Sequence, residues 1–136
     1  DLIGEEIGMI VEASLAHHID ALIVSNTTLE RPASLKSGFA GEAGGLSGAP
    51  LKPFAQKALE AAAEAAAGRL PLIAVGGIES SADAWARIRA GASAVQVYSA
   101  LIYNGAGLVS AIKRDLAARL RADGFATLSE AVGSGR

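Results

Sequence analysis

Cysteine is absent from the 136 residues of the chain. This absence excludes a disulfide framework, a thiolate metal site and a cysteine nucleophile. Basic residues form no patch and the net charge is −2, so the composition does not indicate a nucleic-acid-binding surface. No apolar run approaches the roughly 18 residues that a transmembrane helix needs. We therefore expect a soluble chain, with any membrane contact made by residues outside it.

A signal segment, charged and then apolar, is also missing from the N-terminus. The chain opens at Asp1 without an initiator methionine and passes almost at once into a helical pattern. We therefore expect the start to be a cut inside a longer protein. The length of 136 residues agrees with this expectation, because a closed eight-fold β/α barrel needs about 250 residues.

The composition that is present suits a buried parallel sheet, with 51% hydrophobic residues, 16 glycines and a mean hydropathy of +0.34. Apolar periodicity and turn residues predict three strands, each followed by a helix, after one leading helix. This order indicates a parallel α/β fold, either the closing part of a β/α barrel or part of a doubly wound sheet. The expected elements are a helix at 4–17, a strand at 21–25, a helix at 52–67, a strand at 72–75, a helix from Ser80 or Ser81 to 90, a strand at 94–98 and a helix at 108–122.

The turns after the last two strands favour the barrel. Gly76 and Gly77 follow the second strand, and Tyr98 and Ser99 follow the third, before a segment with the length of one short extra helix. Barrels often bind phosphate with the loops after their last two strands and a short extra helix. The GGLSG segment at 44–48 adds a third flexible turn. The alternative is that the glycines only let a helix pack close to the sheet.

Asn26, Thr27 and Thr28 stand where a barrel strand delivers its last side chains to the active-site face. An Asn carboxamide matches the edge of an imide ring, or a carboxylate beside an N–H. Such residues are equally common as strand terminators and caps. The following 20 or so residues are rich in Gly, Ser and Pro and lack periodicity, so they form a long loop that is either functional or disordered.

Four ordered motifs carry a resemblance to a known family: IVSNTT followed by RP, then GGLSG, VGGI and GASAVQVYSAL. In this order and spacing they resemble the C-terminal half of dihydroorotate dehydrogenase, the FMN enzyme of pyrimidine synthesis. The forms SNTT, VQVYSAL and GFATLSEAVG are more similar to the class 2, quinone-reducing branch. The resemblance implies the C-terminal part of a TIM (β/α)8 barrel, with parallel strands alternating with helices, and assigns all of 1–136 to one FMN-binding barrel domain.

The resemblance also implies residue roles. It places Ser25 at the flavin, and Asn26 and Thr27 at the carboxylate and ring amides of orotate. The positions that match the backbone cradle of the FMN phosphate are Ser47, Gly48, Gly77, Tyr98 and Ser99. The base that removes the substrate proton, a Ser in class 2, and the Lys beside the flavin lie N-terminal to Asp1 in the family pattern. We therefore expect no catalytic base within these residues, and no activity from them alone. Ala106 departs from the Pro of many relatives.

The implied activity is oxidation of (S)-dihydroorotate to orotate, with FMN and a quinone acceptor, in de novo UMP synthesis. The intact enzyme would be a peripheral membrane protein on the cytoplasmic face. One alternative is another FMN-dependent β/α-barrel oxidoreductase, which would not need the Asn-Thr-Thr group at 26–28. The other is a non-catalytic half-barrel that binds phosphate.

Five other side chains carry simpler interpretations. His17 and His18 are adjacent, so they point about 100° apart on a helix and suit a helix end better than a metal site. No metal is therefore expected. Lys36 and Lys52, in or near the long loop, are expected to be solvated charges. Trp85 is expected to anchor packing between helices.

Overall fold

A computed structural model describes all residues, 1–136. Three parallel strands form one sheet in the order β1 (Leu22–Val24), β2 (Leu72–Val75) and β3 (Ala92–Gln96). Parallel neighbours require a crossover connection, and here each crossover contains a helix. The expected alternation of parallel strands and helices is therefore confirmed.

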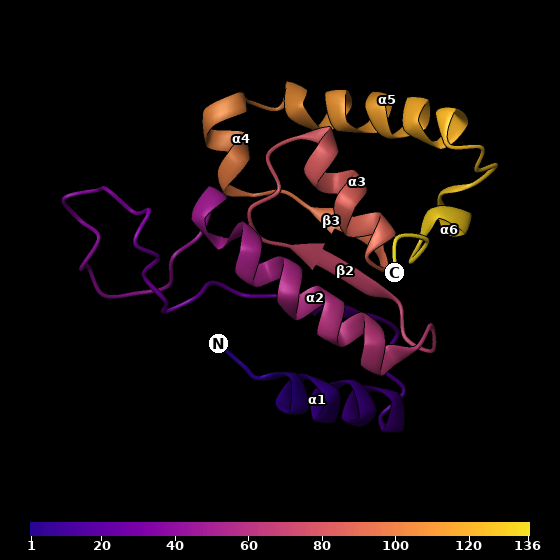
Figure 1. Cartoon of the computed structure of the whole chain (residues 1–136), viewed down its shortest axis with the longest axis horizontal. Coiled ribbons are helices and arrows are strands. Elements are labelled where there is room, and N and C mark those ends of the chain that lie inside the picture. Colours follow the sequence, from indigo (N-terminus) through magenta and orange to yellow (C-terminus); the bar gives the residue numbers. More distant parts are fainter.

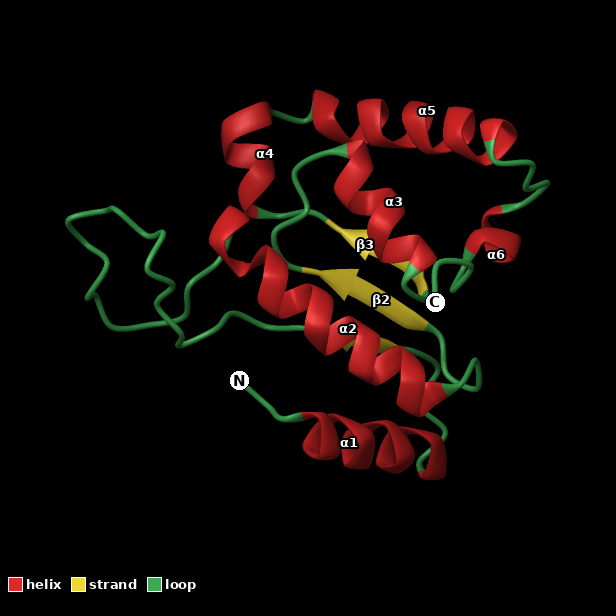
Figure 2. Cartoon of the chain, in the orientation of Figure 1, coloured by secondary structure: helices red, strands yellow, loops and turns green.

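The helices cover one face of the sheet and its flanks (Figure 1). Figure 2 shows α2 and α3 over the face turned to the viewer, with α1 beside α2 and α5 beside α3. Because the helices gather on this face, the opposite face of the sheet is left without a helical layer. The helices are α1 (Gly4–Ala16), the 3-10 helix η1 (Ala49–Leu51), α2 (Lys52–Ala66), α3 (Ser81–Arg89), α4 (Ser99–Asn104), α5 (Gly107–Ala122) and α6 (Leu128–Ala131).

The hydrophobic core lies between the sheet and this helical layer. It contains 18 buried residues, among them Val11 of α1, Leu59 of α2 and Leu72 of β2. Trp85 of α3 belongs to the same core and meets Phe125 edge to face, with ring centroids 6.1 Å apart. The packing role expected for Trp85 is thus confirmed.

The other face of the sheet has little cover. Ile23 of β1 is 52% exposed and points away from the helical layer, whereas its neighbour Val24 is buried in the core. Successive side chains of a strand point to opposite faces, so this bare face is the one that carries Ile23. In a closed barrel the face opposite the helices is the interior.

Most expected boundaries hold within one or two residues, and β2 matches at both ends. Ser80 caps α3 as expected, since its Oγ accepts a hydrogen bond from the Asp83 N–H at 3.1 Å. The short extra helix after the third strand is present as α4. His17 follows the last residue of α1, in agreement with a helix end.

Two expectations were wrong. The third strand starts at Ala92 instead of residue 94, because the chain extends directly after the Gly91 turn and Ala92 pairs with Leu72. It ends at Gln96 instead of residue 98, because Tyr98 already leads into α4. The short helix α6 was not expected; the Thr127 hydroxyl caps it by accepting from the Glu130 N–H.

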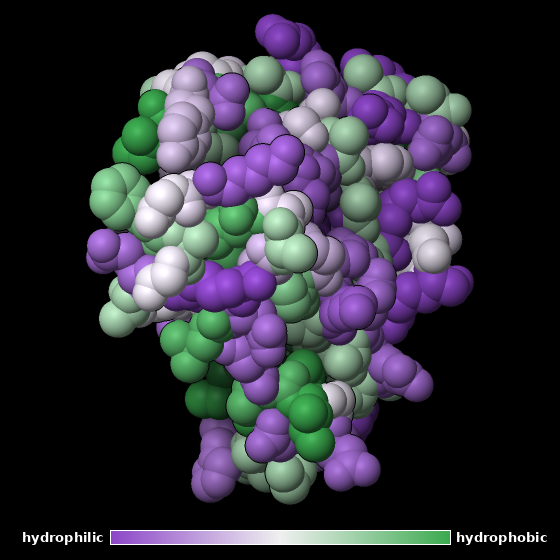
Figure 3. All heavy atoms as spheres, turned by 60° about the vertical axis from the view of Figure 1, so that its left-hand side comes forward, coloured by the Kyte–Doolittle hydropathy of each residue, from purple (hydrophilic) through white to green (hydrophobic).

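Hydrophobic side chains are also exposed on α1 and the residues before it. Leu2, Ile3, Met9 and Ile10 are all exposed, and in Figure 3 green atoms gather low on the molecule, at the height of α1. Exposed apolar surface of this kind is typical of a contact with another element or protein. None of the helices combines the length and the apolar character needed to cross a membrane.

Candidate functional site

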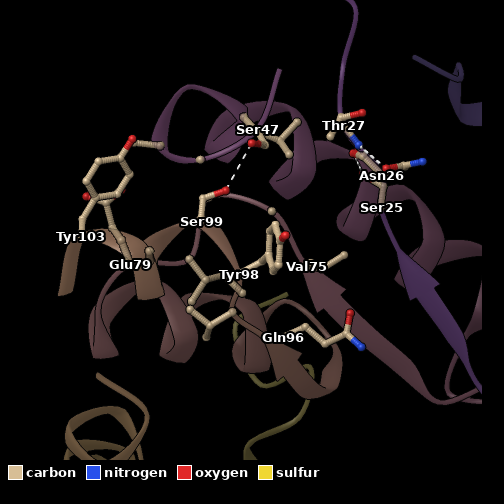
Figure 4. Close-up of a pocket in the computed structure, with 18 of the residues that line it drawn as sticks. Ser25, Asn26, Thr27, Ser47, Val75, Glu79, Gln96, Tyr98, Ser99 and Tyr103 are labelled. Carbon is tan, nitrogen blue, oxygen red and sulfur yellow. Dashed lines mark hydrogen bonds between the residues drawn. The ribbon is translucent and has the colours of Figure 1, made fainter. Parts of the chain in front are cut away.

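A pocket of about 880 Å³ opens at the carboxyl ends of the three strands (Figure 4). Strand ends, the 44–48 turn and α4 all contribute to its wall. In parallel α/β folds this is the edge at which ligands bind. All eight residues predicted for the site line it: Ser25, Asn26, Thr27, Ser47, Gly48, Gly77, Tyr98 and Ser99. The fold thus brings them together, while their individual roles stay predictions.

Two of the three predicted phosphate turns touch each other. The Ser99 hydroxyl donates a hydrogen bond to the Ser47 hydroxyl at 3.2 Å, drawn as a dashed line in Figure 4. Gly48 has a φ of +75°, and a Cβ added there would lie 3.7 Å from the Ser99 Cβ. The 44–48 turn and the turn after β3 therefore form one continuous wall of the pocket.

The third turn, after β2, packs tightly on the start of α2. Gly76 and Gly77 both have positive φ values, +109° and +69°. A Cβ at Gly77 would lie only 2.6 Å from the Lys52 Cα, and one at Gly76 would lie 2.9 Å from the Ala55 Cβ. The interpretation that these glycines allow a helix to approach closely is confirmed. It is compatible with a phosphate role, because the same turn lines the pocket.

The donor set along this wall fits a phosphate. The N–H groups of Gly48 and Gly77 donate no hydrogen bond within the chain, and both residues line the pocket. Ser99 is the first residue of α4, so its N–H has no partner within that helix. Free backbone N–H groups and hydroxyls are the groups that commonly hold phosphate oxygens.

Lys52 is not the solvated charge that the sequence suggested. It is the first residue of α2, and its Nζ lies 2.9 Å from Asp83 Oδ1 and 3.9 Å from Glu79 Oε2. This pairing could not be predicted from local patterns, because the two carboxylates are about 30 residues away along the chain. Since the charge of Lys52 is already balanced by carboxylates, the backbone N–H groups are left as the principal donors toward the pocket.

Asp83 is stabilised as a carboxylate behind the Gly76–Gly77 turn. Burial alone would raise the pKa of Asp83, but hydrogen bonds from Lys52, from the Ser80 hydroxyl and from the Glu79 N–H outweigh burial and lower it. The Ser80 and Glu79 donors lie 2.7 and 3.2 Å from Asp83 Oδ2. This cluster connects the start of α2 with the start of α3.

Arg87 of α3 is a buried cation that sequence reasoning missed. Only 2% of its surface is exposed, and its Nη2 donates to the carbonyls of Lys52 at 2.9 Å and Gly76 at 3.0 Å. Its Nη1 donates to the Gln56 side chain. Burial lowers the pKa of Arg87, partly offset by the charges of Asp83 and Glu60. A single basic residue in a helical pattern is usually exposed, so the sequence carried no signal for this role.

Asn26 and Thr27 form the other end of the pocket. The Asn26 Oδ1 accepts a hydrogen bond from the Thr27 N–H at 2.8 Å, and the Ser25 hydroxyl lies 3.4 Å from the Asn26 carbonyl. The Asn26 Nδ2 group donates no hydrogen bond within the chain. The Asn26 carboxamide therefore keeps its donor free for a ligand.

Thr28 does not join this group. It is 2% exposed, does not line the pocket, and pairs with Leu46 in an isolated antiparallel bridge. Its hydroxyl bonds to the Asp1 carboxylate, which also accepts the Leu29 N–H at 2.7 Å. Thr28 is therefore a structural residue, and the expectation that it faces the active site with Asn26 and Thr27 was wrong.

Comparison with known proteins agrees with the motifs. The sequence model of the family described as dihydroorotate dehydrogenase matches residues 1–120. The protein named dihydroorotate dehydrogenase (quinone) from Xanthobacter autotrophicus is 56% identical over 133 residues, which cover 98% of this chain and 37% of the relative. The protein of the same name from Rhodospirillum rubrum is also 56% identical, over 98% of this chain and 36% of its own length.

Solved structures show the same likeness. A crystal structure of DHODH from Eimeria tenella in complex with ferulenol superposes with a TM-score of 0.93 at 42% identity, over 98% of this chain and 36% of that one. The ligand-free form from the same organism gives 0.92 at the same identity. These structures are TIM barrels, so the fold class is confirmed. The chain spans a little over a third of the relatives it matches, and along nearly all of its own length it belongs to the dihydroorotate dehydrogenase family.

Proposed function

We propose that residues 1–136 form the C-terminal part of one FMN-binding barrel, in an enzyme that oxidises (S)-dihydroorotate to orotate and passes electrons to a quinone. The observation that carries this proposal is the pocket, in which Asn26 and Thr27 share one cavity with the phosphate-type turns at Ser47, Gly48 and Ser99. The quinone acceptor is supported by the names of the relatives. Because quinones reside in membranes, the proposal also places the enzyme as a peripheral protein at the cytoplasmic face of a membrane.

The place of these residues within a larger barrel has separate support. The bare sheet face at Ile23, together with the exposed apolar side chains of α1, offers surface that another β/α unit would cover. An open parallel sheet also leaves unpaired strand edges, which proteins normally close or cover. These observations favour the barrel proposal over a half-barrel that works alone.

In this proposal the N–H groups of Gly48 and Gly77, with the Ser47 and Ser99 hydroxyls, hold the FMN phosphate. The phosphate would anchor the cofactor at one end of the pocket, and Ser25 would lie near its ring system. FMN, when bound, supplies the hydride acceptor that the oxidation needs. No side chain of residues 1–136 is assigned as the catalytic base.

Asn26 and Thr27 would hold the substrate at the opposite end. The free Nδ2 donor of Asn26 suits a carboxylate or a ring carbonyl, and the Thr27 hydroxyl suits a ring amide. Their task is to orient the substrate ring against the cofactor, because a hydride moves only between closely stacked, well-aligned groups. Orientation by two neighbouring side chains at one strand end also limits which acids fit.

The test is Asn26→Ala in the complete polypeptide that carries these residues. We expect FMN to stay bound, because the phosphate turns are unchanged. Orotate affinity and the rate of flavin reduction by dihydroorotate should fall by roughly 10- to 1,000-fold, as expected for about 1.5–4 kcal/mol of directed hydrogen bonding. Flavin absorbance measures the cofactor content, and stopped-flow absorbance measures the reduction.

Asn104→Ala is the matched control, because Asn104 lines the same pocket but its Nδ2 donates to the Ala100 carbonyl of its own helix at 3.1 Å. This variant should keep the affinity for orotate. If Asn26→Ala instead loses its flavin and keeps its orotate affinity, Asn26 belongs to the cofactor site. If another small acid reduces the flavin and dihydroorotate does not, the protein is a different FMN barrel oxidoreductase.

A further inference from the structure

The long segment after β1 is held together by one side chain. Between Val24 and Ala49 the chain contains no helix and no regular strand, and in Figure 1 it extends to the left, away from the sheet. Arg31 lies near its start. Its guanidinium donates hydrogen bonds to backbone carbonyls on both limbs of this loop.

On the outgoing limb, the Arg31 Nη1 donates to the carbonyls of Leu29 at 3.1 Å and Glu30 at 3.2 Å. On the returning limb, the Nε donates to the Ala40 carbonyl at 3.0 Å, and the Nη2 donates to the carbonyls of Glu42 at 2.9 Å and Gly44 at 2.7 Å. A planar guanidinium with five donors can satisfy such a spread of acceptors, whereas an ammonium group cannot.

The returning limb continues directly into the pocket. After Gly44, a Cβ added at Gly45 would lie 1.9 Å from the Thr27 Oγ1, so Gly45 rests against the predicted substrate end. Two residues later, the Ser47 hydroxyl accepts the hydrogen bond from Ser99 in the predicted phosphate wall. The short stretch 44–48 therefore touches both ends of the pocket.

Apart from Arg31, few contacts hold the returning limb. The bridge between Thr28 and Leu46 ties one point, with N···O distances of 2.7 and 3.2 Å in its two hydrogen bonds. Residues 36–39 and 41–45 are all exposed, so no buried apolar packing orders them. Fixing the backbone of a free residue costs conformational entropy, so the limb needs contacts to be ordered, and the Arg31 hydrogen bonds are the principal ones.

We propose that Arg31 is a positioning residue that holds stretch 44–48 in place for both ends of the pocket at once. The inference rests on the proposed function, because it takes FMN phosphate and orotate as the two ligands. It assigns to one loop arginine, which does not line the pocket, a joint effect on cofactor and substrate affinity.

The experiment compares Arg31→Met, Arg31→Lys and Lys36→Met in the complete polypeptide. Lys36 is the matched control, because it is an exposed cation of the same loop with no ion pair or side-chain hydrogen bond. Three quantities are measured: the dissociation constant of FMN, the dissociation constant of orotate, and the rate of limited proteolysis within residues 32–43. The unfolding temperature checks that each variant is folded.

Arg31→Met should weaken both FMN and orotate by about 2- to 30-fold, the range for mutations that act through a contact network. It should also speed cleavage of the loop, because proteolysis follows local opening. Arg31→Lys should recover only part of each effect, and Lys36→Met should match the parent protein. The unfolding temperature should change little, since the loop lies outside the core.

The proposal is overturned if Arg31→Met binds both ligands like the parent, if only one ligand is affected, or if Lys36→Met has the same effect. A parent protein that binds neither FMN nor orotate would instead refute the proposed function. In that case the cleavage rates still decide the role of Arg31, and equal rates for Arg31→Met and Lys36→Met would refute it.

Discussion

An alanine at position 77 should disrupt the turn that follows β2. Gly77 has a φ of +69°, and a side chain in this region costs about 1–2 kcal/mol. The new Cβ would also lie 2.6 Å from the Lys52 Cα and 2.7 Å from its backbone N, so backbone must move. Overpacking of this kind costs about 1–3 kcal/mol. Together the free energy of unfolding should fall by roughly 2–5 kcal/mol.

The same displacement of the turn backbone should also weaken FMN binding. If the Gly77 N–H donates to the FMN phosphate, its displacement removes a hydrogen bond to a charged group, worth about 1.5–3 kcal/mol. The dissociation constant of FMN should then rise by about 10- to 150-fold. A bulkier Gly77→Val should abolish binding of both FMN and inorganic phosphate. Urea unfolding gives the stability, and quenching of flavin fluorescence gives the affinity.

Gly124→Ala separates the two contributions. Gly124 has a similar φ of +81°, but no atom lies within 4 Å of the added Cβ, and the residue does not line the pocket. The free energy of unfolding of Gly124→Ala should fall only by the cost of the positive φ, about 1–2 kcal/mol. Its FMN affinity should be unchanged. The reasoning is refuted if folded Gly77→Ala binds FMN as tightly as Gly124→Ala.

Three further predictions concern stability and activity. The pKa of Asp83 is lowered in the folded protein. Its stabilising contribution is therefore present above about pH 4, the ordinary pKa of an aspartate, and is lost as the pH falls through the lowered pKa. In urea titrations, Asp83→Asn should have a smaller free energy of unfolding at pH 7, and this free energy should depend less on pH in the acid range. The prediction is contradicted if the free energy of unfolding falls equally steeply with acid pH in the parent and in Asp83→Asn. Trp85→Ala should cost about 3–5 kcal/mol, seen as a lower urea midpoint, and a loss below about 1 kcal/mol would rule out its anchoring role. Residues 1–136 expressed alone should show no dihydroorotate oxidation at any FMN concentration, and turnover above the buffer blank would overturn the assignment of the base to residues outside them.

Local patterns were sufficient for the elements that frame the pocket. The apolar run at 72–75 between Pro71 and Gly76 predicted β2 with both boundaries, and the polar residues after each strand marked the edge at which the pocket opens. These features depend on neighbours along the chain, through periodicity, caps and turn residues. The motifs then indicated a family, which the comparisons confirmed.

Contacts between distant residues could not be predicted in the same way. Thr28 looked identical in kind to Thr27, yet pairing with Leu46 turned it away from the pocket. Lys52 looked like a solvated charge until α3 brought Asp83 to it. In each case the position of a partner decided the role of the residue, and sequence spacing carries no information about that partner.

The sequence by itself thus determined the parallel α/β order, the strand ends at which the pocket opens and the family to which the chain belongs. Only the tertiary structure decided that Arg87 is buried behind the Gly76 turn and that Arg31 ties the two limbs of a loop. The physical reason is that helices, strands and turns follow from local backbone preferences and apolar periodicity. The environment of a charged side chain depends on carbonyls and carboxylates that folding brings to it from elsewhere in the chain.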